Sequence, residues 1–211
     1  WADASDAVGF DWGSAADFGG IDGLTVGLSA AVGNDTYATG SAGAEVTYSA
    51  GLTYATDAGD TAVTVGAGFI QASSDNTVAL NDQASSVALS ISAVTGNLTL
   101  GAGFSNGSGI STKSPAVEID AVTWTEVGAK YVSGDMTLTV SGGSGEADDA
   151  ALGSAGTGDD STTNVSGSID YTIADGIVGT IGYTDVENTD DGTSIAGNSG
   201  SSWYVGATVS F

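Results

Sequence analysis

The sequence predicts an all-β fold, an antiparallel up-and-down β-barrel that crosses a membrane with strands. Apolar residues recur at every second position along most of the chain, and the connections between these runs alternate between short and long. Of the 211 residues, 34 are Gly and one is Pro, and Gly and Ser with scattered Val, Leu, Ile and Tyr suit strands better than helices. No apolar run approaches the ~18 residues of a membrane-spanning helix. We therefore expect one barrel domain over residues 1–211.

The alternation is clearest between Ala44 and Tyr54, where apolar side chains are separated by Glu45, Thr47 and other small or polar residues. A strand with one apolar and one polar face fits a wall between two different media. The polar face is mostly Gly, Ser and Thr, without the Lys and Glu of an ordinary solvated face. In chain order, such runs occupy residues 8–12, 24–32, 44–54, 63–69, 87–93, 98–104, 127–131, 136–140, 165–173, 177–183 and 203–211.

The connections strengthen this prediction because short and long ones alternate from Leu24 onward. Membrane barrels have short periplasmic turns and long extracellular loops, whereas a soluble sandwich has no reason to sort its loops by length. A soluble β-sandwich or surface-layer domain is the alternative fold. Short connections rich in Gly and Asp are predicted at 56–61, 95–96, 133–135 and 174–176, and long ones at 33–42, 71–85, 105–120, 143–162 and 185–201.

The charge and the missing residue types exclude several functions. The chain has 26 Asp and Glu against two Lys and no Arg, for a formal net charge of −24, and it has neither His nor Cys. Disulfides, Ser-His-Asp catalysis and His-ligated zinc are excluded, and so few cations argue against nucleic-acid binding. No two carboxylates are marked as a catalytic pair, so we predict no enzyme and no required cofactor.

A few charges fall on the predicted polar face, where they would escape the cost of contact with lipid. Glu126 and Lys130 share one face and form a candidate charge pair. The alternative is that such residues only hydrogen-bond to neighbours in the wall. The candidate pore-lining residues are Asp11, Glu45, Glu126, Lys130 and Asp170.

Adjacent carboxylates in the predicted long loops are candidate Ca²⁺ ligands, because Ca²⁺ prefers oxygen donors. No EF-hand spacing is present. Diffuse divalent binding, bridging to lipopolysaccharide, and an acidic surface suited to a saline habitat remain alternatives. The candidates are Asp148, Asp149, Asp159, Asp160, Asp190 and Asp191.

The C-terminal residues 203–211 alternate and end on Phe211. This segment resembles the terminal strand of Gram-negative outer-membrane proteins, which the barrel-assembly machinery reads. Residues 6–12 and 18–29 show the hairpin pattern of the same proteins. The whole chain is similar to an alphaproteobacterial general porin of the Rhodobacter type. The residues of the resembling terminal strand are Trp203, Val205, Ala207, Val209 and Phe211.

This resemblance implies a sixteen-stranded barrel, of which about ten or eleven strands are visible, so that about five strands and an inward-folded loop precede Trp1. In the alternative, residues 1–20 form a plug or tail and ten strands close alone. Phe211 is expected at the periplasmic rim.

The implied function is an outer-membrane porin, a water-filled channel for passive diffusion of small hydrophilic solutes and ions. The net charge of −24 predicts a preference for cations. The implied partners are outer-membrane lipid, lipopolysaccharide, the assembly machinery and two further copies in a homotrimer. The chain departs from the family in lacking the arginine cluster that lines its constriction. A non-channel acidic surface protein, an adhesin or layer component, is the alternative function.

Overall fold

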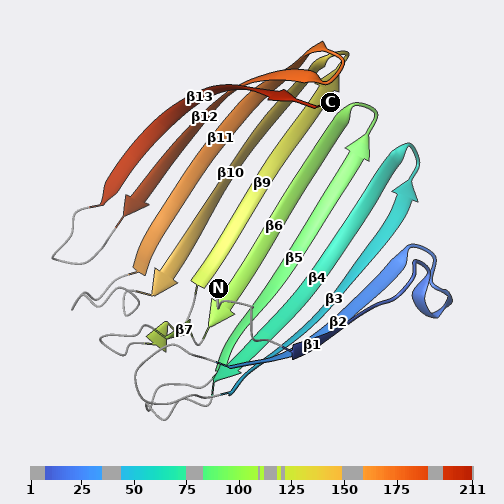
Figure 1. The fold of residues 1–211 in the computed structure, drawn as a ribbon, viewed down its shortest axis with the longest axis vertical. Helices are drawn as coiled ribbons and strands as arrows, with labels where there is room; N and C mark the ends of the chain where they lie inside the picture. Colours follow the sequence, from blue (N-terminus) through green and yellow to red (C-terminus); the bar gives the residue numbers. More distant parts are fainter. Residues whose placement is uncertain are drawn as a thin grey trace.

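The computed structural model describes residues 8–34, 44–74, 83–108, 110–111, 118–119, 122–148, 159–189 and 197–210. Within them, eleven strands form one antiparallel sheet in up-and-down order, as predicted (Figure 1). The strands are β1 (Val8–Gly13), β2 (Leu24–Asn34), β3 (Ala44–Ala58), β4 (Thr61–Ser74), β5 (Gln83–Thr95), β6 (Leu98–Ser108), β9 (Val122–Ser133), β10 (Met136–Asp148), β11 (Asp159–Ala174), β12 (Ile177–Thr189) and β13 (Asn198–Val209).

Two minor elements interrupt this order. A single 3-10 turn, η2 (Phe18–Gly20), lies between β1 and β2. The short strands β7 (Ile110–Ser111) and β8 (Glu118–Ile119) pair with each other between β6 and β9. No helix in the described part of the chain is long and apolar enough to cross a membrane.

The register gives the sheet one apolar and one polar face. Leu28 pairs with Ala50, and Ala50 pairs with Phe69, on the apolar face. On the other face Ser29 pairs with Ser49, and their hydroxyl oxygens lie 2.6 Å apart. Because cross-strand partners project to the same side, period two along each strand becomes two continuous surfaces.

The sheet has no conventional core. Among the described residues, no large side chain is fully buried. The accessible surface is 13433 Å² for a 20.4 kDa chain, whereas a globular protein of that mass exposes roughly 8,800 Å². The apolar face is therefore uncovered by protein, as expected of a wall that faces lipid.

The strands extend beyond the predicted runs, and the outward face changes character as they do. Apolar outward residues give way to polar ones at Gln71 on β4, Asn106 on β6 and Asp185 on β12. Ladder hydrogen bonds do not require apolar side chains, so pairing continues where the alternating pattern ends. Parts of the predicted long loops, including Asp148, Asp159 and Asp160, consequently lie on strands.

The predicted short connections are tight turns along one rim. Gly59, Gly96, Gly134 and Gly176 adopt φ of 66°, 53°, 58° and 76°, the left-handed region that glycine enters without strain. The last strand ends on the same rim, because Val209 pairs with Ile177 next to the Gly176 turn. Figure 1 shows the C-terminus beside these turns. The predicted orientation of the terminal strand relative to the turns is confirmed.

The sheet is curved but not closed. In the described residues, β1 and β13 each pair on one side only. The alternative in which ten strands close alone is wrong for this structure, because β2 pairs with β1 and not with β13. Residues 8–13 form a strand of the wall, not part of a plug or tail.

Candidate pore-lining wall

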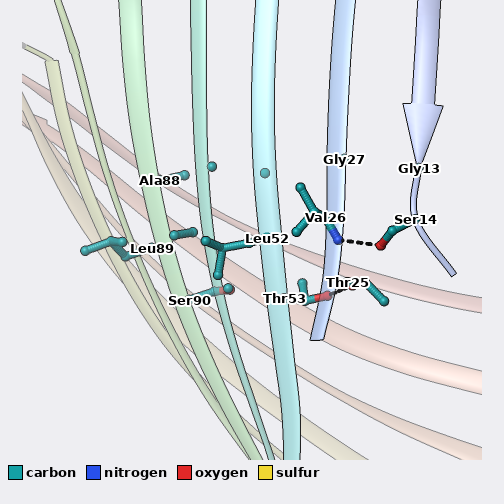
Figure 2. Close-up of a pocket in the computed structure, with 14 residues that line it drawn as sticks. Gly13, Ser14, Thr25, Val26, Gly27, Leu52, Thr53, Ala88, Leu89 and Ser90 are labelled. Atoms are coloured by element: carbon teal, nitrogen blue, oxygen red, sulfur yellow. Dashed lines mark hydrogen bonds between the residues drawn. The ribbon is translucent and has the colours of Figure 1, made fainter. Parts of the chain in front are cut away.

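The polar face is hollowed in several places. One concavity of about 510 Å³ lies over β1 to β5 (Figure 2), and an adjoining one of about 610 Å³ includes Asp11. A third, of about 380 Å³, lies between Glu126 and Lys130 on β9. The polar face is thus the concave face of the sheet.

A row of residues without bulky side chains forms the floor under the first two concavities. The register aligns Gly13, Gly27, Gly51, Gly68 and Ala88 across β1 to β5. The wall is therefore thin at this level, and the space that side chains would fill is open.

Hydrogen bonds between neighbouring strands hold the polar side chains of this face. In Figure 2, the backbone N–H of Val26 donates to Ser14 Oγ at 2.9 Å, which extends the β1–β2 pairing past the end of β1. The hydroxyls of Thr25 and Thr53 also bond across β2 and β3. Further along, Thr162 donates to Asn188 Oδ1 at 2.8 Å. The face is polar and largely uncharged, which suits contact with water.

The register places the candidate pore-lining residues on this face but spreads them over several strands. Asp11 pairs with Ser29 on β2, and the backbone of Glu45 pairs with Gly33 and Ser74. Glu126 and Lys130 lie on β9, and Asp170 lies on β11.

Glu126 and Lys130 are both exposed. They are four positions apart on β9, so their Cα atoms are separated by roughly 13 Å. The side chain of Glu126 lies over Gly103 of β6, because a Cβ at Gly103 would be 3.1 Å from Glu126 Oε1. An ion pair between them would require both side chains to extend toward each other along the strand.

Asp170 is held differently from Glu126. The Thr180 hydroxyl donates to Asp170 Oδ1 at 2.5 Å across the β11–β12 pair, and Asp170 is half-buried. Asp170 therefore makes the wall hydrogen bond that the alternative interpretation describes, while its negative charge remains on the polar face.

Sequence reasoning missed two aromatic residues on the polar face. Trp124 lies over Gly143 and Gly145 of β10: a Cβ at Gly145 would collide with Trp124 Cε3, and one at Gly143 would be 2.8 Å from its Cζ2. Tyr204 similarly occupies the space above Gly182. The sequence could have revealed Trp124, because residues two positions apart on a strand share a face and Glu126 is two positions away.

The predicted Ca²⁺ ligands are only partly described. Asp148 and Asp159 are directly opposite each other in the last pair of the β10–β11 ladder, and Asp160 is opposite Ala147. Asp149, Asp190 and Asp191 lie outside the described residues. Within the described ranges, no group of three or more acidic, His or Cys residues could hold a metal ion.

The terminal strand presents its predicted residues to the apolar side. Trp203 and Val205 are 72% and 81% exposed, and Ala207 and Val209 share their face. The ring of Trp203 lies 4.6 Å from that of Tyr183, centroid to centroid. Phe211 lies outside the described residues.

A curved antiparallel sheet with an uncovered apolar face, a hollowed polar face and short turns on one rim is the wall of an outer-membrane β-barrel. The chain belongs to the Gram-negative porin family, whose model matches residues 4–192. It is accordingly an outer-membrane protein, and the family supports the prediction that it is not an enzyme.

Solved structures of outer-membrane proteins share this fold. OccK2 (OpdF) of Pseudomonas aeruginosa, solved in complex with glucuronate, matches with a TM-score of 0.67 and 13% identity over 97% of this chain and 62% of that one. The outer membrane channel DcaP of Acinetobacter baumannii matches with a TM-score of 0.64 and 16% identity over 97% and 62%.

OmpT of Vibrio cholerae, with its loop L8 deleted, matches with a TM-score of 0.56 and 18% identity over 96% and 62% of the two chains. This chain thus spans 62% of the length of each of these three structures. No curated protein matches the sequence significantly.

Proposed function

We propose that the protein forms a water-filled channel for passive diffusion of small hydrophilic solutes and ions across the outer membrane. The observation that carries this proposal is the concave face itself, which is lined by Gly, Ser and Thr and holds exposed Glu126 and Lys130. A polar, hydrated wall lowers the barrier for solutes that the hydrocarbon layer excludes. Family membership favours a channel over a non-channel surface protein.

The proposal includes a preference for cations. Glu126 and Asp170 lie on the polar face with Asp11 and the backbone of Glu45, and Lys130 is the one cation among the described residues. Fixed negative charge on a low-dielectric wall raises the local concentration of cations.

The proposal also includes the finer features that the sequence resemblance implies. These are assignment to the Rhodobacter-type branch, assembly as a homotrimer, contact with lipopolysaccharide, and recognition of the last strand by the barrel-assembly machinery. The exposed, apolar side chains of Trp203, Val205 and Val209 support the last of these, recognition of the terminal strand.

The direct test is conductance in a planar lipid bilayer, with the natural full-length protein added from detergent. Stepwise, ohmic conductance increases are expected, with swelling of protein-containing liposomes in small sugars. Migration that shifts on boiling would show in the same preparation that the barrel is folded. Folded protein that inserts without conductance would contradict the channel function.

A further inference from the structure

The polar face of β9 carries three chemically different groups in a line. From the loop end toward the turn rim, its positions are Trp124, Glu126, Gly128 and Lys130. The turn at Gly134 follows Ser133, so Lys130 is nearer the short-turn rim. No other strand in the described part of the chain places a cation on this face.

The wall between Glu126 and Lys130 is bare. Gly128 pairs with Gly101 of β6 and with Ser141 of β10, so the largest side chain at this level is a serine hydroxymethyl group. The concavity of about 380 Å³ lies here, with Glu126 toward the loops and Lys130 toward the turns. A solute can therefore lie against the backbone between the two charges.

The loop end of this line, at Trp124 and Glu126, favours a cation. The indole lies over the backbone of Gly143 and Gly145, and Gly145 is buried. The indole therefore lies on the β10 side of β9, whereas the Glu126 side chain, over Gly103, lies on the β6 side. An aromatic face attracts an ammonium group, and the Glu126 carboxylate two positions away attracts the same group.

We propose that this line is a binding position for short zwitterionic peptides, an inference that rests on the proposed channel function. The peptide ammonium lies between Trp124 and Glu126, its backbone lies over Gly128, and its carboxylate binds Lys130. Three extended residues span about 10 Å. An ammonium between Trp124 and Glu126 is about five positions, or roughly 16 Å, from the Lys130 Cα, and the lysine side chain closes the difference by extending toward the loop end. Thr99 and Thr139 are the cross-strand partners of Lys130 on this face, and we expect their hydroxyls to donate to the same carboxylate.

The test measures the binding of triglycine inside single channels of the natural full-length protein, from concentration-dependent current noise in a planar bilayer. Two analogues each lack one charge: triglycine amide has no carboxylate, and N-acetyltriglycine has no ammonium. Triglycine is expected to bind about threefold or more tighter than either analogue, the scale of one solvent-exposed charge interaction.

Single-residue variants test which side chains bind each end of the peptide. Glu126→Gln and Trp124→Leu should weaken triglycine and its amide but not N-acetyltriglycine, and Lys130→Gln should weaken triglycine and N-acetyltriglycine but not the amide. Lys130→Arg and Glu126→Asp should retain binding. Asp57→Asn is the matched control, because it removes one negative charge on the polar face of β3 and should leave triglycine binding unchanged.

Two results overturn the inference while leaving the channel intact. One is binding of triglycine amide as tight as that of triglycine or tighter, which would mean that Lys130 holds no carboxylate. The other is an equal effect of Asp57→Asn and Glu126→Gln, which would mean that only the overall negative field acts. Absence of any conductance from folded, inserted protein would instead overturn the proposed function and this inference with it.

Discussion

Thr180 donates a hydrogen bond of 2.5 Å from its hydroxyl group to the carboxylate of Asp170, across the β11–β12 pair on the polar face. The bond holds the carboxylate against the wall without removing its charge. Asp170 can therefore act on ions through its field, and its hydrogen bond and its charge can be separated by mutation.

Cation preference should depend on the charge of the polar face and should decline with salt. Under a KCl gradient, the reversal potential is expected to favour K⁺ at low salt and to approach zero near 1 M. The reason is that the Debye length falls from about 10 Å at 0.1 M to about 3 Å at 1 M. Replacing Glu45 by Gln and Asp170 by Asn should reduce the preference. Thr180→Val, which keeps the charge, should not, and an anion-preferring wild type would refute the prediction.

The tight turn at Gly176 should be less tolerant of a side chain than the turn at Gly134. Both have positive φ, but a Cβ at Gly176 would lie 2.5 Å from the carbonyl oxygen of Ser210, whereas a Cβ at Gly134 meets nothing within 4 Å. Gly134→Ala should cost about 1 kcal/mol through backbone strain alone. Gly176→Ala should cost more because the terminal strand must also move, and equal urea midpoints for the two variants would contradict this.

Trimer formation should depend on small outward residues of the N-terminal strands. Ala30 and Ala50 lie on the apolar face of β2 and β3, where small side chains allow the walls of neighbouring barrels to approach closely. Ala44 is an even number of positions from Ala50 along β3. Ala50→Trp should convert trimers to monomers in native mass spectrometry in mild detergent. Ala102→Trp, on the same face of β6, is the control and should remain trimeric. A wild type that is only monomeric would exclude the trimer.

Divalent cations should stabilise the loop end of the barrel. Asp148 and Asp159 are directly opposite each other, and like charges in that position destabilise a strand pair by about 0.2–1 kcal/mol. A chelator at fixed ionic strength should lower the melting temperature of the wild type, because ions bound only to the folded state stabilise it.

The double variant with Asp148→Asn and Asp159→Asn should be less sensitive to the chelator and more stable in its presence. Glu146→Gln is the matched control, because Glu146 is opposite Ser161 rather than another carboxylate. It should keep the wild-type response to the chelator. No response in the wild type would remove the prediction of bound Ca²⁺.

Much of the fold could be predicted because the physical constraint is local. Period two decides which residues share a face within one strand, so the alternation placed Glu126, Lys130 and Asp170 on the polar side. The glycines at residues 96, 134 and 176 marked the turns because left-handed backbone is costly for other residues. The alternation failed at strand ends, where polar residues continue the ladder beyond the apolar band, and at Trp124 and Tyr204, where aromatic side chains lie on the polar face.

What the sequence determined by itself was therefore the type of wall, its two faces and the alternation of turns and loops. The tertiary structure decided which residues meet across strands: Asp148 opposite Asp159, Trp124 over Gly143 and Gly145, and the glycine row from Gly13 to Gly68. These relationships depend on strand register, and register follows from turn geometry and ladder hydrogen bonds between residues far apart in the chain. The curvature that hollows the polar face likewise arises only when the twisted strands pair.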